Sequence, residues 1–275
     1  MTRFVNNTKT VLLLGALTGL FVAIGGMLGQ NFLLPFLLMG IAMNFGAFFF
    51  SDKIAIASMR GKEVGEGDPL YEMVDELRQR AGLPMPRVYV CPQQAPNAFA
   101  TGRSPSKAAV AVTAGAMQLL NEQEMRGVMA HELAHIKNRD TLTSTIAATV
   151  AGVLAFVAQW GFFILGGRSE NGNPLVLIAV VILGAVGAAL IKAMISRSRE
   201  FVADADGAAI AGSPDGLMSA LAKLESLNRR IPMQNPNPAQ NNLFIVEPFA
   251  GESLTKLFAT HPPTEQRIAA LRKSS

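Results

Sequence analysis

The feature that most constrains this chain is a run of 42 residues without a charge, from Thr10 to Ser51. An α-helix needs about 20 apolar residues to cross the hydrocarbon core of a bilayer, so the run has room for two helices. The segment Gly29-Gln30-Asn31 lies near its middle and supplies a turn. The apolar part is too long for a cleaved signal peptide. The sequence therefore predicts an N-terminal transmembrane hairpin over residues 1–52.

A second pair of uncharged runs covers residues 141–167 and 171–191. Each run reaches the length of about 20 residues that a membrane span requires. A short polar turn containing Arg168 and Glu170 separates them. These runs predict a second hydrophobic hairpin over residues 141–195, embedded in the membrane. The alternative is a helical hairpin buried in a soluble core.

The composition supports a membrane protein. Charged residues make up 16 % of the chain, against about 25 % in soluble domains. The single cysteine, Cys91, excludes a disulfide framework and a zinc cluster held by thiolates. We attribute the net charge of +4 to basic residues beside the membrane spans, and we expect no binding to nucleic acid.

The basic residues also predict an orientation, because cytoplasmic loops of membrane proteins are enriched in Lys and Arg. Such residues flank the open ends of both hairpins: Arg3, Lys9, Lys53, Arg60, Lys62, Lys137, Arg139, Lys192, Arg197 and Arg199. The loops at the closed ends carry no net charge. Both hairpins are therefore expected to enter and leave the membrane on the cytoplasmic side, where all polar segments would lie.

The polar segments predict one domain in two parts. Residues 53–140 form the first part, with a helix over 70–80, strands at 87–91, 97–101 and 108–113, and a helix from Asn121 to Ile136. Glu124, three residues after Asn121, is typical of a capping box. Residues 196–275 form the second part, with a mobile loop at 229–242 and a final helix over 264–272. The expected fold is mainly α with a small β-sheet.

The most informative motif is His131-Glu132-Leu133-Ala134-His135. Residues four apart on a helix differ in direction by about 40°, so both imidazoles can bind one metal ion. Glu132 then points toward the edge of that site, where the attacking water would lie. This geometry is typical of metal-assisted hydrolysis. The alternative is a surface helix whose two histidines have ordinary hydrogen-bond partners.

A catalytic zinc needs a third protein ligand, usually His or Glu. Cys91 and His261 are candidates, but Glu200 is the better one. Asp204 follows it by four residues on the same helical face, where it can accept the outer N–H of a ligand histidine. The two apolar runs between His135 and Glu200 cross the membrane there and back, which returns Glu200 to the side of the histidines. The alternative pairs Glu200 with a neighbouring arginine and leaves Asp204 in solvent.

Four segments together resemble the HtpX membrane zinc metalloproteases: residues 97–102, 129–140, 200–204 and 260–267. The resemblance implies an α+β zincin-like endopeptidase of the bacterial inner membrane, with one Zn²⁺ per chain and its site on the cytoplasmic side. It implies degradation of misfolded or damaged membrane proteins under stress, and self-cleavage. By resemblance, His131, His135 and Glu200 bind zinc and Glu132 is the general base. A more distant resemblance is to the prenyl-protein CAAX endopeptidases.

Two further residues have candidate roles. By similarity to related zinc peptidases, His261 is expected to donate a hydrogen bond to the developing oxyanion; the alternative is a histidine held at a helix start by Pro262. Asn97 opens an edge strand and is a candidate substrate-binding residue, or merely a turn residue after Pro96. Arg267 is expected to pair with a carboxylate rather than with substrate. The competing functions are a membrane zinc scaffold or sensor and a CAAX-type processing peptidase.

Overall fold

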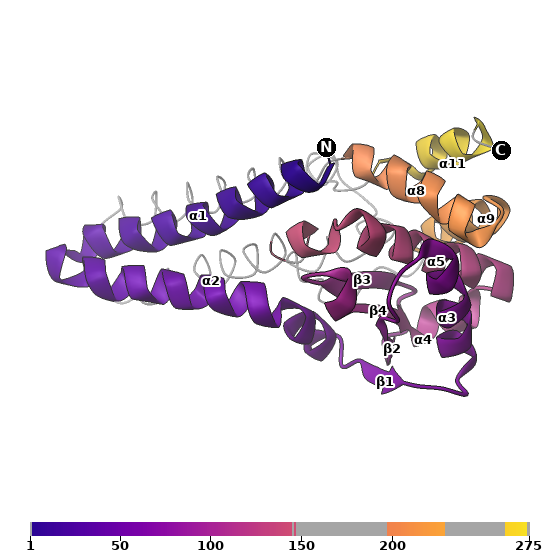
Figure 1. Cartoon of the computed structure of the whole chain (residues 1–275), viewed down its shortest axis with the longest axis horizontal. Coiled ribbons are helices and arrows are strands. Elements are labelled where there is room, and N and C mark those ends of the chain that lie inside the picture. Colours follow the sequence, from indigo (N-terminus) through magenta and orange to yellow (C-terminus); the bar gives the residue numbers. More distant parts are fainter. Residues whose placement is uncertain (1, 145, 147–196, 229–261, 274–275) are drawn as a thin grey trace.

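The computed structural model describes residues 2–144, 146, 197–228 and 262–273. A long helical hairpin extends from one side of a compact unit of strands and helices (Figure 1). Three predicted features lie outside the described residues: nearly all of the second hydrophobic hairpin, the loop at 229–242, and His261.

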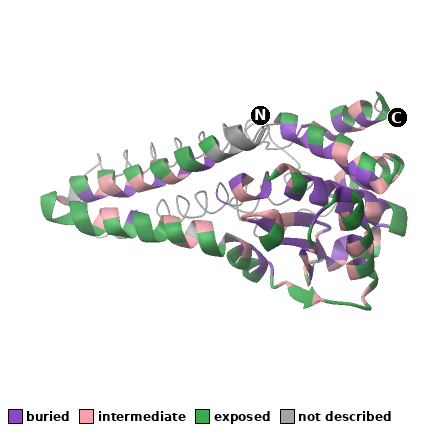
Figure 2. Cartoon of the chain, viewed as in Figure 1, coloured by how far each residue is buried: buried purple, intermediate pink, exposed green. Residues whose placement is uncertain are grey.

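The helical hairpin consists of α1 (Thr2–Leu28) and α2 (Gln30–Ser58). Gly29 joins them with φ 124°, a backbone conformation that suits glycine. Asn44 links the two helices, since its amide donates to the Leu14 carbonyl at 2.8 Å and to Thr18 Oγ1 at 2.6 Å. Large apolar side chains on α2 are exposed (Figure 2), as is typical of a surface that faces lipid. Both helices are long and apolar enough to cross a bilayer.

The sheet contains β1 (Lys62–Val64), β2 (Arg87–Cys91), β3 (Ala98–Gly102) and β4 (Ala108–Thr113). Its order is β1-β2-β4-β3, with β2 and β4 parallel and the other two pairs antiparallel. A 3₁₀ turn, η1 (Pro105–Lys107), leads into β4. The three longer strands were predicted. The three-residue β1 was not, because it is too short to show a periodic pattern.

The two faces of the sheet pack against different helices. One face contacts α3 (Pro69–Ala81) and α5 (Glu122–Asn138), which with the later helices form the main core. The short α4 (Ala114–Leu119) connects β4 to α5. The opposite face packs against Ala55 and Ile56 in the last turn of α2 and against Met59, which directly follows the helix. The helix that spans the membrane therefore ends as part of the sheet's packing.

Three later helices complete the unit: α8 (Arg197–Ala211), α9 (Asp215–Asn228) and α11 (Thr264–Lys273). Helices α8 and α9 pack on α5, and α11 packs on both of them. The helix over 264–272 is confirmed, whereas α9 was not predicted. The whole is mainly helical with a small mixed sheet, as the sequence indicated.

Candidate metal centre

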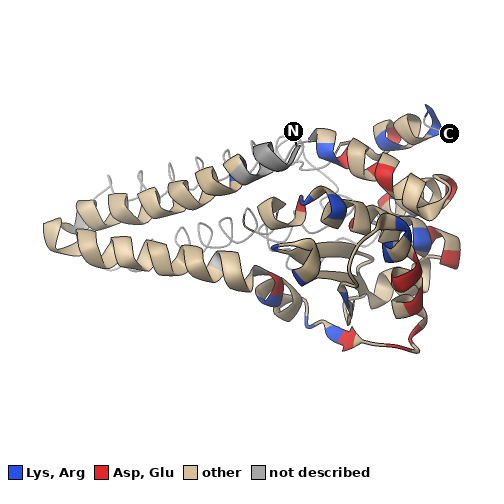
Figure 3. Cartoon of the chain, viewed as in Figure 1, with Lys and Arg blue, Asp and Glu red and all other residues tan. Residues whose placement is uncertain are grey.

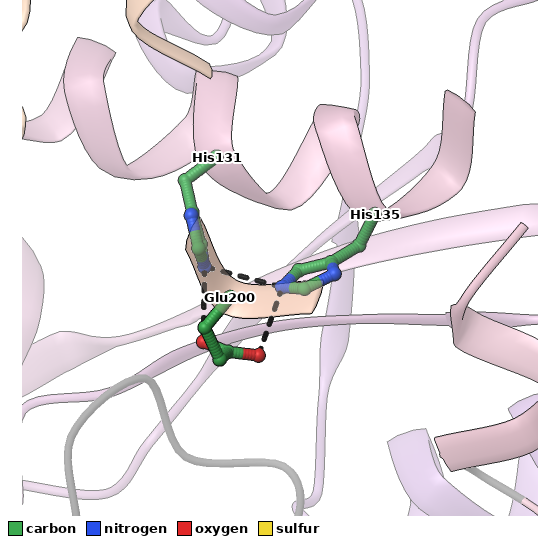
Figure 4. Close-up of side chains that lie close together, drawn as sticks. All are labelled: His131, His135 and Glu200. Carbon is green, nitrogen blue, oxygen red and sulfur yellow. Dashed lines mark hydrogen bonds and ion pairs between the residues drawn. The ribbon is translucent and has the colours of Figure 1, made fainter. Parts of the chain in front are cut away.

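Helix α5 presents both motif histidines on one face. The predicted capping box is present: Asn121 accepts from the Glu124 N–H and Glu124 accepts from the Asn121 N–H, each at 2.9 Å. From this start the helix runs without interruption through His131 and His135. Their Nε2 atoms lie 3.2 Å apart and point to a common position (Figure 4).

Glu200, on α8, faces the two histidines (Figure 4). Its Oε2 lies 3.8 Å from His131 Nε2, and its Oε1 lies 3.6 Å from His135 Nε2. Zinc bonds of about 2.0–2.1 Å in tetrahedral geometry place ligand atoms roughly 3.3 Å from one another. The three side chains, whose ligand atoms all lie within 4.8 Å, therefore fit one zinc ion. Cys91 packs on the opposite face of the sheet and does not take part.

Close packing of two backbones brings α8 this near to α5. A Cβ atom at Gly207 would lie 2.9 Å from the Cα and 3.0 Å from the backbone nitrogen of His131. Glu200 and Asp204 lie seven and three residues before Gly207, so all three face α5 from one side of α8. At the other end of the contact, Asn138 donates to Asp206 at 2.8 Å. The absence of a side chain at Gly207 thus allows α8 to lie close enough to α5 for Glu200 to reach the two histidines.

Asp204 connects the ligand histidine to a buried arginine. Its Oδ1 lies 3.0 Å from His131 Nδ1, within reach of the outer N–H as predicted. Arg267 on α11 donates to both carboxylate oxygens of Asp204, at 2.9 and 2.6 Å, and only 1 % of its surface is exposed. Its Nη1 also lies 3.6 Å from Glu200. The predicted pairing of Arg267 with a carboxylate is therefore confirmed.

Asp140 is a further residue beside the site, and its place there was not predicted. Its Oδ2 lies 3.4 Å from His135 Nδ1, and Arg199 approaches its other oxygen at 3.5 Å. Arg139 adopts a left-handed conformation, φ 58°, which ends α5 and turns the chain back. Asp140 follows His135 by five positions, whereas neighbours on a helical face are three or four positions apart, so regular helical spacing would not place them together. The signal was therefore absent from the periodicity.

The buried side chains around the histidines carry more negative than positive charge, and a divalent cation would balance the difference. Four carboxylates (Glu132, Asp140, Glu200 and Asp204) and two arginines (Arg199 and Arg267) are buried here. Burial lowers the pKa of His135, but hydrogen bonding to Asp140 and the nearby carboxylates raise it to about 9 when no metal is present. The electrostatic potential of the site therefore favours a positive charge at the position between the two histidines and Glu200.

Opposite forces act on the Asp204 carboxyl. Burial raises its pKa, but the hydrogen bonds and charges of Arg267 and His131 together have the larger effect. The pKa of Asp204 is therefore lowered, to about 2. At neutral pH Asp204 is therefore a carboxylate, which can accept a hydrogen bond from the outer N–H of His131.

Two further predicted residues, Glu132 and Asn97, are both buried. Glu132 is buried, with 4 % of its surface exposed, and its charge raises the pKa of both His135 and Arg267. Asn97 is buried directly before β3, which lies at the edge of the sheet. Its backbone N–H donates to Thr113 Oγ1 at 2.8 Å. Pro262, the first residue described after His261, is buried.

Residues 67–275 match the family described as Peptidase family M48. The chain is a member of peptidase family M48. It is 50 % identical to the Protease HtpX homolog of Desulfatibacillum aliphaticivorans over 276 residues, covering 97 % of this chain and 89 % of that protein. The homologue from Syntrophotalea carbinolica is also 50 % identical, over 273 residues that cover 97 % and 98 % of the two chains.

The fold of this M48 chain is similar to that in the crystal structure of S. mikatae Ste24p. The TM-score is 0.53 at 18 % identity, and the match covers 98 % of this chain and 66 % of that one. The likeness therefore concerns the fold alone. Family membership and the His-His-Glu cluster together establish a zinc metallopeptidase, and α1 and α2 establish its membrane spans.

Proposed function

We propose that this M48 protease degrades misfolded or damaged membrane proteins at the cytoplasmic face of a bacterial inner membrane, as part of a stress response. The observation that carries the proposal is the zinc site of His131, His135 and Glu200 together with its connection to the membrane hairpin. Asp140 contacts His135, and Thr143, three residues later, contacts Thr10 near the start of the span in α1. Substrates that emerge from the bilayer would meet the site without leaving the membrane surface.

His131, His135 and Glu200 would hold the zinc ion, which when bound would polarise a carbonyl and make a water molecule acidic enough to lose a proton near neutral pH. Glu132 accepts the proton of the attacking water and then delivers it to the leaving amine. It is suited to this work because it neighbours His131 in sequence and its charge acts on His135. Asp204 and Asp140 hold the outer nitrogens of the two imidazoles.

Two residues are assigned to substrate. A substrate in extended conformation adds to the edge strand β3 through main-chain hydrogen bonds, and Asn97 at the start of that strand binds it. His261 donates to the developing oxyanion. The assignment is supported by α11, which begins three residues later and brings Arg267 to the zinc ligands.

The cytoplasmic orientation is supported by the charges. Lys53 and Arg60 follow the second span, whereas the turn between α1 and α2 carries no charge (Figure 3). We also propose self-cleavage, because in this orientation the site lies on the same side of the membrane as the chain's own polar segments.

The test compares the purified full-length wild type with Glu132→Ala, in zinc content and in cleavage of casein and of an unfolded membrane protein in proteoliposomes. We expect about one zinc per chain in both proteins and cleavage by the wild type only. Glu122→Ala, an exposed change in the first turn of the same helix, should retain both properties. Cleavage by Glu132→Ala at the wild-type rate would contradict the mechanism.

The scaffold alternative makes a different forecast for His261→Ala. A structural zinc fills all four positions with protein groups, so losing His261 would release the metal. We expect retained zinc with slower turnover. Cleavage of casein but not of the membrane substrate would leave the protease assignment intact and reject the proposed substrate class.

A further inference from the structure

The tip of the β3–β4 hairpin lies at the membrane boundary. Arg103, in the turn after β3, donates from Nη1 to the carbonyl of Phe49 at 3.3 Å, and its guanidinium lies 5.0 Å from the centre of the Phe49 ring. Phe49 belongs to the last turn of the apolar span Gln30–Phe50. The hairpin tip therefore reaches the depth at which α2 leaves the bilayer.

Two other contacts place the same boundary independently. The carbonyl of Gly102, at the end of β3, accepts from Thr141 Oγ1 at 2.9 Å, where the second uncharged run begins. The Oγ1 atom of Thr143 lies 3.2 Å from the Oγ1 atom of Thr10, which is near the start of the span in α1. The ends of three apolar segments thus converge on one level, and the hairpin tip is bonded to two of them.

Basic and apolar side chains alternate at this level. Phe45 and Phe50 are 57 % and 45 % exposed, which suits contact with acyl chains. Lys53, one turn beyond Phe49 on α2, lies 5.7 Å from the Phe50 ring. Lys107 closes the hairpin turn and is exposed. The coloured, charged residues of α2 lie at the end of that helix near the sheet (Figure 3).

These cations differ from others on the same domain. Arg78, Arg80 and Arg126 form ion pairs with carboxylates of α3. Within the described residues, the one hydrogen bond of Arg103 goes to the Phe49 carbonyl, and Lys53 and Lys107 form no ion pair. The nearby Asp52 is neutralised by Arg87 at 2.6 Å. Guanidinium and ammonium groups so placed match the phosphates of lipid headgroups.

We propose that Arg103, Lys107 and Lys53 form a binding site for anionic phospholipid headgroups, which seats the β3–β4 hairpin on the membrane surface. The site uses the free donors of Arg103 for phosphate, while the neighbouring phenylalanines enter the acyl region. Because β3 is the edge strand, this contact holds one end of that strand at the lipid interface.

The test uses a fluorophore on Ser106→Cys, in the hairpin turn, with the full-length protein in nanodiscs of phosphatidylcholine with or without phosphatidylglycerol. The native Cys91 is buried, and burial raises its pKa to about 11, so it reacts slowly with the label. Ser213→Cys, exposed beyond the far end of α8, is the matched control. A spin label on the lipid headgroup reports contact by quenching.

We expect headgroup quenching severalfold stronger at residue 106 than at residue 213, and increased further by phosphatidylglycerol. Arg103→Gln with Lys107→Gln should remove the phosphatidylglycerol dependence, whereas Arg272→Gln with Lys273→Gln at the end of α11 should leave it intact. Equal quenching at both labels, or strong quenching at residue 106 by aqueous iodide alone, would overturn the proposal. Dependence on free phosphate rather than on lipid composition would do so as well.

Discussion

Asp204 and Arg267 form a buried ion pair. Both are 1 % exposed, and two hydrogen bonds join their opposite charges. Removing one partner of such a pair leaves an uncompensated charge in a medium of low dielectric constant. The same carboxylate orients His131, so the pair couples zinc binding to the packing of α8 against α11.

Asp204→Asn keeps the shape of the side chain and removes its charge. We expect the free energy of unfolding to fall by about 3–5 kcal/mol and zinc affinity to fall roughly 10- to 100-fold. The first is measured by thermal unfolding in detergent micelles, and the second by competition with a chelator. Glu265→Gln, exposed in the first turn of α11, is the control and should change neither quantity.

The pH dependence of this difference provides a second check on the same variant. The folded-state pKa of Asp204 is depressed to about 2, against roughly 3.9 in an unfolded chain. Its stabilisation is therefore fully present above about pH 4 and is lost as the pH falls toward 2. A gap between wild type and variant that already closes between pH 7 and 5 would be inconsistent with this pair as its source.

Helix α8 is the element that assembles the site, because it carries both Glu200 and Asp204. Its side chains Ala203 and Ile210 join the main core, and at Gly207 its backbone also lies directly against that of α5. The ordinary separation of packed helices is 8–10 Å in axis distance, and small residues permit the shorter approaches. At Gly207 the neighbouring atoms are the Cα and nitrogen of His131 itself.

Gly207→Ala therefore tests the packing of α8. A Cβ at this position would lie 2.9 Å from the His131 Cα, and backbone atoms cannot move aside as a flexible side chain can. We expect α8 to shift away from α5, with a loss of about 1–3 kcal/mol in stability and weaker zinc binding. Gly65→Ala, with nothing within 4 Å of the added methyl, should be neutral. Zinc affinity equal to wild type in Gly207→Ala would refute this account.

For the molecule as a whole, α2 makes membrane span and enzyme one structure. Its first part is exposed and apolar (Figure 2). At its other end Ala55, Ile56 and the following Met59 are buried against Tyr89, Cys91 and Phe99 of the sheet. The ion pair between Asp52 and Arg87 reinforces the junction. The orientation of the domain relative to the bilayer is thus set by packing rather than by a linker.

Ile56→Ala removes part of that packing. Ile56 is 7 % exposed, and truncation of a buried isoleucine costs about 2–5 kcal/mol. Ile54, two residues earlier, is 50 % exposed, so Ile54→Ala should change stability by no more than about 0.5 kcal/mol. Thermal unfolding of the two variants gives the comparison. Similar losses from both, or from neither, would argue against a packed junction between α2 and the sheet.

Much of this protein follows from local pattern alone. The apolar hairpin, three strands, α3, α5 with its capping box, and the two histidine ligands were predicted from spacing, since periodicity and metal-ligand geometry act over a few residues. Glu200 was predicted because ligand chemistry and the number of crossings restrict the candidates. Strand β1 and helix α9 were not predicted. The strand is too short to show a pattern, and no distinctive motif marks the helix.

What the linear pattern leaves open depends on groups far apart in the chain. Asp140 reaches His135 only because Arg139 turns the backbone left-handed, and Arg267 finds Asp204 across 63 residues. The close approach at Gly207 and the seating of Arg103 on Phe49 are likewise contacts between separate elements. Local periodicity specifies which face a residue occupies, but the partner on that face is chosen by the packing of the whole chain.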